Sequence, residues 1–153
     1  MQMTAENPSK LAAPAGYSGK PAADKLGYKD GQHIAFIALP TQLAHLAAAR
    51  SFARCDQHAG PALGEGAGSP DIIHYFTRSA SELIAALPVL EQRIARHGMI
   101  WVSWPKKASK VPTDVTEDVI RNQALTGDLV DVKVCAVDPV WSGLKLVIRK
   151  DRR

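Results

Sequence analysis

The chain has 153 residues, which is enough for one domain with a sizeable core and too few for two. Its 46% apolar and 22% charged residues are typical of an ordinary globular protein, and no apolar run is long enough to span a membrane. The net charge of +4 arises in the second half, because residues 1–76 carry six basic and six acidic side chains, whereas 77–153 carry thirteen and nine.

The first residues differ in composition from the rest. Residues 1–16 are rich in Ala, Pro, Ser and Asn without periodicity, which predicts a flexible tail before a single domain at 17–150 and a basic tail at 151–153. They lack the basic start and apolar run of a signal peptide. The two cysteines, Cys55 and Cys135, are too few for a disulfide framework or a cysteine-built zinc site. These features predict a cytoplasmic protein.

Two helices flank the first apolar run of the chain. A short helix is expected at 20–27, with Gly27 just past its end. The run at 33–39 is almost entirely apolar, which is typical of a strand with both sheet faces covered. Pro40 ends this strand, and Thr41 is then expected to cap a helix over 42–53.

A loose, glycine-rich region follows. Residues 54–57 are polar and allow only a weak prediction of a short strand, and six glycines and prolines lie between 60 and 70. The apolar segment 71–77 predicts a second buried strand.

The next helix has clear boundary signals. Ser79 and Glu82 form a capping box that opens it, and it is expected to reach about Arg96. Gly98 suits the left-handed position past its end. Pro88 lies inside this helix, where it predicts a kink or a break.

The remaining elements complete an alternating pattern. They are a buried strand at 99–104, a helix at 115–124 opened by a capping box of Asp114 and Glu117, and two alternating strands at 129–137 and 144–149 joined as a hairpin. The order predicts an α/β, Rossmann-like fold with a mostly parallel sheet of about five strands. Helices would cover both faces, and an antiparallel hairpin would close one edge.

Several sequence blocks resemble known proteins. The blocks W-V-S-W-P-K-K-A-S at 101–109, V-D-V-K-V-C-A-V-D at 130–138 and W-S-G-L-K-L at 141–146, with G-Y-S-G at 16–19, resemble the signature of a small bacterial family of unknown function. This resemblance implies no activity. The segment 26–31 and the closing helix and hairpin are similar, more loosely, to the S-adenosylmethionine-dependent methyltransferase fold, and fold alone does not fix function.

The cofactor loop of that fold is not found in the sequence. A nucleoside-binding domain needs glycines after its first strand, because the backbone must approach the ligand closely there. Residues 39–44 read L-P-T-Q-L-A and contain no glycine. Asp56 is the only acidic residue that could hold a ribose. We therefore expect no conventional cofactor, and we expect a methyltransferase-like fold that is degenerate at this loop.

The best candidate site follows the strand at 99–104. In open α/β sheets ligands bind beyond the carboxyl ends of strands, and the loop 105–114 leaves such an end. Its cationic and hydroxyl groups suit an anion, and two tryptophans suit a planar group beside it. The expected ligand-binding residues are Lys106, Lys107, Ser109, Thr113, Trp104 and Trp141. The alternative is an exposed loop whose hydroxyls make turns, with tryptophans that pack the core.

Other chemistries lack their residues. The five histidines have no metal-ligand spacing, the cysteines have no base beside them, and no nucleophile elbow occurs, so no metal and no catalytic residue is assigned. Three hypotheses remain open. The first is a non-catalytic module that binds a small anionic ligand, the second is a protein-interaction or regulatory subunit, and the third is a weak nucleic-acid binder without any recognised binding motif.

Overall fold

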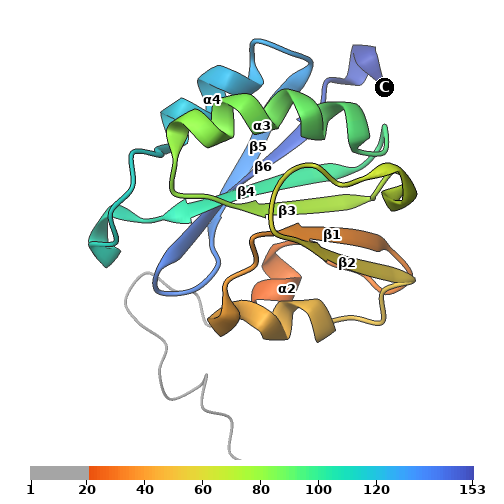
Figure 1. Cartoon of the computed structure of the whole chain (residues 1–153), viewed down its shortest axis with the longest axis horizontal. Coiled ribbons are helices and arrows are strands. Elements are labelled where there is room, and N and C mark those ends of the chain that lie inside the picture. The colour runs from red at the N-terminus through yellow and green to blue at the C-terminus, as the bar shows by residue number, and fades with distance from the viewer. Residues whose placement is uncertain (1–20) are drawn as a thin grey trace, which may run out of the picture.

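The computed structural model describes residues 21–153, so the expected tail at 1–16 lies outside the described part (Figure 1). These residues form one six-stranded sheet in the order β2-β1-β3-β4-β6-β5. The strands are β1 (His33–Ile37), β2 (Arg54–His58), β3 (Ile72–Phe76), β4 (Met99–Pro105), β5 (Leu129–Ala136) and β6 (Trp141–Ile148). The first four are parallel, whereas β6 runs antiparallel to both β4 and β5. The expected α/β class with a closing hairpin is confirmed.

The three central strands are the apolar runs of the sequence. Every residue of β3 and β4 is buried, and so are the last four residues of β1. Burial on both faces explains why these strands show continuous hydrophobicity instead of alternation. By contrast, β2 is a polar edge strand that pairs with β1 alone, which settles the weak prediction at 54–57 and gives the sheet its sixth strand.

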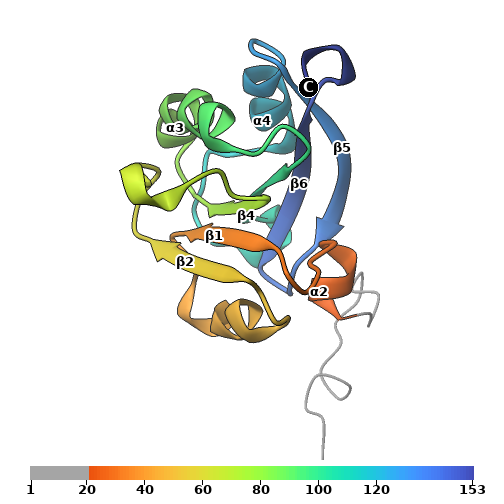
Figure 2. The same ribbon diagram turned by 90° about the vertical axis from the view of Figure 1, so that its right-hand side faces the viewer.

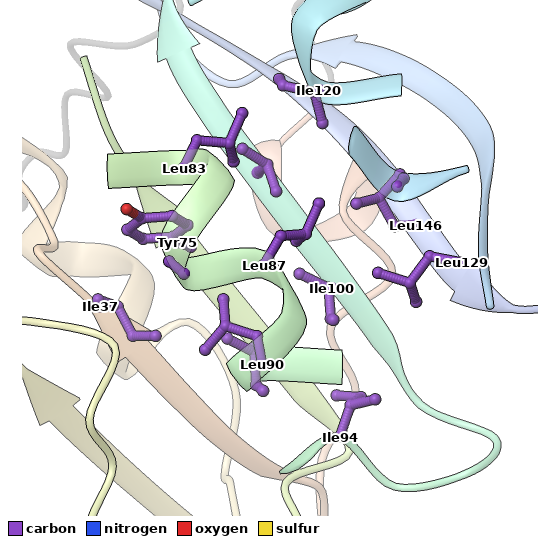
Figure 3. Packing of buried hydrophobic residues seen from close by; sticks show 14 of the residues in the cluster. Ile37, Tyr75, Leu83, Leu87, Leu90, Ile94, Ile100, Ile120, Leu129 and Leu146 are labelled. Atoms are coloured by element: carbon purple, nitrogen blue, oxygen red, sulfur yellow. The ribbon is translucent and has the colours of Figure 1, made fainter. Parts of the chain in front are cut away.

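Helices cover both faces of the sheet, as the views in Figures 1 and 2 show. One face carries α3 (Ala80–Arg93) and α4 (Glu117–Ala124), and the other carries α2 (Ala22–Lys25) and a 3-10 helix at Thr41–Ala48. Figure 3 shows the apolar side of α3 packed on the sheet, with Leu83, Leu87 and Leu90 pointing inward. Each face thus has its own hydrophobic core.

The helix expected at 42–53 is shorter and of another type. It is a 3-10 helix that ends at Ala48, and the Thr41 side chain makes no capping hydrogen bond, so that part of the prediction is wrong. Only Leu43 and Leu46 are buried in this segment. Their spacing of three matches the three residues per turn of a 3-10 helix.

The helix α3 differs from expectation at its proline and at its end. It runs unbroken through Pro88, which is exposed, so the carbonyl that loses its partner can face water. Ser79 caps the helix by accepting from the backbone N–H of Glu82, as predicted. The helix stops at Arg93, and Gly98 does not adopt a left-handed conformation. A Cβ at Gly98 would lie 2.6 Å from the carbonyl oxygen of Asp71, so close backbone approach explains this glycine.

The helix α4 begins two residues later than expected. Its N-cap is Thr116, whose hydroxyl accepts from the N–H of Val119, so the predicted box of Asp114 and Glu117 is wrong. Asp114 instead accepts from the N–H of Ala80 at 2.7 Å. This carboxylate therefore neutralises the start of α3, and it ties the loop after β4 to the loop after β3.

The chain ends beside the hairpin. A 3-10 turn at Lys150–Arg152 overlaps the expected basic tail at 151–153, and ion pairs of Arg149 and Arg152 with Asp128 hold it. Within residues 21–153, no helix has the length and apolar character needed to cross a membrane.

Candidate functional site

The strand order creates a crevice between β1 and β3, at the carboxyl ends of the strands. The chain passes from β1 outward to β2 and then returns to the other side of β1 as β3, so the strand order reverses between β1 and β3. Ligands of open α/β sheets bind beyond the carboxyl ends of the strands at such a switch point. The loops that leave β1 and β3 therefore define where a site is expected.

A cleft of about 660 Å³ lies at this switch point. It is lined by residues that follow β1, by residues that follow β3, and by one residue each from the loop after β4 and the start of β6. They are Ala38, Pro40, Phe76, Thr77, Arg78, Ser79, Glu82, Pro112 and Trp141. The loop predicted to form the site contributes Pro112, and of the six predicted site residues only Trp141 lines the cleft.

Trp141 lines the cleft and carries a buried hydrogen-bond donor that is not used within the described chain. Its side chain is 8% exposed and packs edge-on against Phe76, with the ring centroids 5.3 Å apart. Among the described residues its indole Nε1–H has no hydrogen-bond partner. Leaving such a donor buried and unpaired costs about 1–3 kcal/mol. A ligand that supplies an acceptor atom would remove this cost.

Two other buried nitrogens share this condition in the described part of the chain: His58 Nε2 and Arg149 Nε. His58 is the last residue of β2, and its carbonyl accepts from the N–H of Ala38. The carboxyl edge of the sheet thus holds both unpaired ring nitrogens. Of these two residues, Trp141 lines the cleft and His58 does not.

The charges of the cleft come from Arg78, which precedes the N-cap of α3, and from Glu82 in the first turn of this helix. Arg78 is exposed, and its guanidinium has no carboxylate partner within residues 21–153. Glu82 lines the same cleft. The helix start itself is already occupied, because Ser79 and Asp114 accept from the N–H groups of Glu82 and Ala80. An anion would therefore meet Arg78 and Trp141 rather than the backbone of α3.

The turn after β1 has the backbone shape of a glycine turn without the glycine. Ala38 has φ of +58°, a left-handed conformation that costs an L-residue about 1–2 kcal/mol, and its side chain is exposed. Ala38 lines the cleft, and it stands at the turn where a conventional nucleoside-binding domain has a glycine. The residues at this turn do not fit a conventionally held nucleoside cofactor.

The only acidic candidate for a ribose contact is engaged elsewhere. Asp56 lies in the middle of β2, and it accepts from His33 Nε2 at 3.0 Å and pairs with Arg54 Nε at 2.9 Å. Burial alone would raise the pKa of Asp56, but the hydrogen bonds from His33 and Arg54 outweigh it and lower the pKa. This carboxylate stabilises the edge of the sheet and does not line the cleft.

In the loop 105–114, which the sequence predicts as the site, the hydroxyl groups form hydrogen bonds with the backbone. The Ser109 hydroxyl donates to the carbonyl of Lys106 and accepts from the N–H of Val111. The Thr113 hydroxyl donates to the carbonyl of Arg78 at 2.8 Å. These bonds bring Lys106 and Ser109 together, and they place Thr113 beside the loop after β3. Both hydroxyls are thus engaged within the chain. Lys107 is exposed, and binding at this loop stays a prediction.

Trp104 and Trp141, which the sequence predicts to line the same site, do not lie side by side. Trp141 pairs with Pro105 across the sheet and Trp104 pairs with Ser142, so the two indoles lie on opposite faces. Trp104 belongs to the core under α3 and α4, whereas Trp141 belongs to the core under α2. They cannot form one aromatic wall.

A histidine, a serine and a tyrosine meet in the interior. His74 is hydrogen-bonded on both ring nitrogens. Its Nδ1 lies 2.6 Å from the Tyr28 hydroxyl, and its Nε2 lies 2.7 Å from the Ser103 hydroxyl. All three side chains are at most 2% exposed, so no substrate reaches them. Burial lowers the pKa of His74 to about 3 and raises the pKa of Tyr28. The trio is a neutral, fully paired network that fixes the core.

No metal site is found among residues 21–153, because no three His, Cys, Asp or Glu side chains there come together in a suitable group. Sequence reasoning missed Arg78 as a site residue. The signal was available, since Arg78 follows directly after a buried strand. The switch point could not be located, however, while the strand at 54–57 was uncertain.

Comparison with known proteins identifies the fold and leaves the family open. No family model and no curated protein sequence matches the chain. Among solved structures, the magnesium protoporphyrin IX methyltransferase from Synechocystis with bound SAH has a TM-score of 0.58 at 11% identity, covering 83% of this chain and 78% of that one. The CcbJ methyltransferase from Streptomyces caelestis has a TM-score of 0.57 at 7% identity, covering 83% and 87%.

A third match broadens the comparison. The fibrillarin pre-rRNA processing protein from Methanococcus jannaschii has a TM-score of 0.56 at 13% identity, covering 93% of this chain and 76% of that one. These identities show the fold alone. The looser of the two resemblances drawn from the sequence is confirmed: the chain has the fold of the S-adenosylmethionine-dependent methyltransferases.

Proposed function

We propose that the chain is a non-catalytic module that binds a small anionic ligand in the cleft between the ends of β1 and β3. The unpaired Nε1–H of Trp141 is the observation that carries this proposal. Buried donors in native proteins are almost always paired, so each exception calls for an explanation. A ligand acceptor atom is our explanation, because the tryptophan that carries this buried donor lines a cleft at the switch point.

The charges of the cleft support a ligand with a single negative charge. Arg78 offers a guanidinium without a carboxylate partner in the described part of the chain, and such a group binds carboxylate or phosphate oxygens well. Glu82 lines the same cleft and would repel a second negative charge. A monocarboxylate or a phosphate diester therefore fits better than a polyphosphate.

The absence of a glycine at Ala38 supports a role other than methyl transfer. A nucleoside held in the conventional way would meet Ala38 in place of a glycine and would find no free carboxylate for its ribose. Two free cysteines support a cytoplasmic location for this binding.

Thermal unfolding against a panel of compounds tests the proposal. The panel contains pyruvate, lactate, a cyclic nucleotide, a sugar phosphate and S-adenosylmethionine. A ligand at about a hundred times its dissociation constant adds about 2.7 kcal/mol, which for a chain of this size is a shift of several degrees. We expect a shift with a singly charged anion, and no shift with S-adenosylmethionine.

Two variants locate the effect. Trp141→Phe removes the donor and keeps an aromatic side chain, and Arg78→Gln removes the charge of an exposed side chain. Both should remove the ligand-induced shift without lowering the Tm of the free protein by more than about two degrees. A shift with S-adenosylmethionine that both variants abolish would instead place the methyl-transfer cofactor in the cleft and overturn the proposal. No shift with any compound would favour a protein partner over a small ligand.

A further inference from the structure

Two lysines face each other across the hairpin. Lys133 of β5 is paired in register with Lys145 of β6, so both side chains project from the same face of the sheet. Residues paired in this way have Cβ atoms only about 4.5–5.5 Å apart, and like charges directly opposite are destabilising. The hairpin therefore carries a repulsion between two like charges.

A third lysine lies beside them. Lys145 is paired on its other side with Trp101 of β4, and the indole Nε1–H of Trp101 donates to the carbonyl of Leu26 at 2.9 Å. This hydrogen bond holds the segment after α2 against the same face, and Lys29 is an exposed residue of that segment. Burial lowers the pKa of Lys145, and the charges of Lys133 and Lys29 lower it further.

The acidic side chains of the adjoining segments are directed elsewhere. Asp24 pairs with Arg50, and Asp30 accepts from the N–H of Ser51. Asp131 of β5 is held by Arg121 of α4, which covers the opposite face. Within residues 21–153, none of the three lysines has a carboxylate partner. The lysine cluster, Lys29, Lys133 and Lys145, is therefore a concentrated positive charge without internal compensation.

We propose that the lysine cluster binds a compact polyphosphate anion. Two lysines paired in register, with a third on the adjoining segment, match several adjacent phosphate charges, and bound phosphate would offset the repulsion between Lys133 and Lys145. An extended nucleic acid fits less well. Single-stranded nucleic acid requires exposed aromatic rings on which bases stack, and the large exposed apolar residues of the described chain are all aliphatic. This site is separate from the cleft and does not depend on the function proposed for it.

Calorimetric titration with inorganic triphosphate tests the proposal. At low ionic strength we expect binding that weakens steeply as salt is added, because the contacts are between charges near the surface. The double variant Lys133→Gln, Lys145→Gln should bind at least about tenfold more weakly. The matched control is Lys110→Gln, Lys150→Gln, which removes the same charge from exposed positions elsewhere and should bind within about twofold of the natural chain.

Stability in the absence of phosphate gives a second readout. Lys145→Gln alone should raise the Tm by roughly one or two degrees at low salt, since it removes the cross-strand repulsion, and this gain should vanish at high salt. Equal loss of binding in both double variants would overturn the site, as would undetectable binding of triphosphate at low salt. Tighter binding of a single-stranded oligonucleotide than of triphosphate, lost in the first double variant, would overturn the assignment to a compact anion.

Discussion

Two buried regions on the same face of the sheet differ in whether their polar groups have hydrogen-bond partners. In the interior, Trp101 donates its indole N–H to Leu26, and His74 has a partner on each ring nitrogen. At the carboxyl edge, Trp141 is almost as deeply buried, yet its indole N–H has no partner among the described residues.

This difference in hydrogen bonding distinguishes groups that stabilise the core from a group that we propose to bind a ligand. In the interior, an unpaired polar group would destabilise the fold, and no ligand could reach it to form the missing hydrogen bond. Pairing these groups gives a rigid core. A buried donor left unpaired at the edge is an exception that calls for an explanation. The comparison therefore supports the proposal that the cleft binds a ligand.

Removing His74 is the strongest way to break the comparison. His74→Ala leaves a cavity in the core and strands the hydroxyls of Tyr28 and Ser103 without their shared partner. We expect a loss of about 4 kcal/mol in the free energy of unfolding, measured by urea denaturation. A loss below about 1 kcal/mol would show that the interior network is not essential to the core.

Acid should weaken the interior network before other parts of the protein. The pKa of His74 is about 3 in the folded chain, and an unfolded histidine has a pKa of about 6.5. The unfolded state therefore binds the extra proton between these values, and stability falls as pH drops from about 6.5 toward about 3, by at most about 1.4 kcal/mol per pH unit. Urea midpoints measured across this range test the slope. His74→Gln should remove most of it between about pH 6 and 5, and an unchanged slope would assign it to other groups.

A matched pair of tryptophan variants sharpens the comparison. Trp101→Phe leaves the carbonyl of Leu26 unpaired in the core and should cost about 2–3 kcal/mol. Trp141→Phe removes a donor that had no partner, and should change the free energy of unfolding by less than about 1 kcal/mol. Urea denaturation of both variants gives the two values side by side. Similar losses would mean that Trp141 has a structural partner after all.

The smallest expected effect concerns the strained turn. Ala38→Gly relieves a left-handed conformation, and the greater freedom of glycine in the unfolded chain offsets part of the gain. The net result should be stabilisation by about 0.5–1 kcal/mol, visible as a rise of a few degrees in Tm. A decrease in Tm would show that the methyl group of Ala38 contributes packing that outweighs the strain.

The sequence predicted the fold well where hydrophobicity decides the outcome. The apolar runs gave the three central strands, and alternation gave the hairpin. The polar strand β2 was only weakly predicted, because an exposed edge strand carries no apolar pattern. Two residues near the start of α4 were both able to cap a helix, and the contact of Asp114 with Ala80 across the fold left Thr116 to do so.

The site depended on features that local patterns do not contain. Trp141 was identified from its residue type and its place before a strand, but its register opposite Pro105 determines that it faces away from Trp104. A shift of one residue would have reversed this result. Arg78 and the cleft itself follow from the strand order, which is a property of the whole sheet.

Nuclear magnetic resonance of the indole N–H groups tests the central claim most directly. The three tryptophans give three separate signals, which Trp101→Phe and Trp141→Phe assign. During titration with the anion that stabilises the protein, the Trp141 signal should move downfield as its N–H gains an acceptor, while the Trp101 signal stays in place. A Trp141 signal that does not respond to a bound anion would contradict the account, because the ligand would then bind elsewhere.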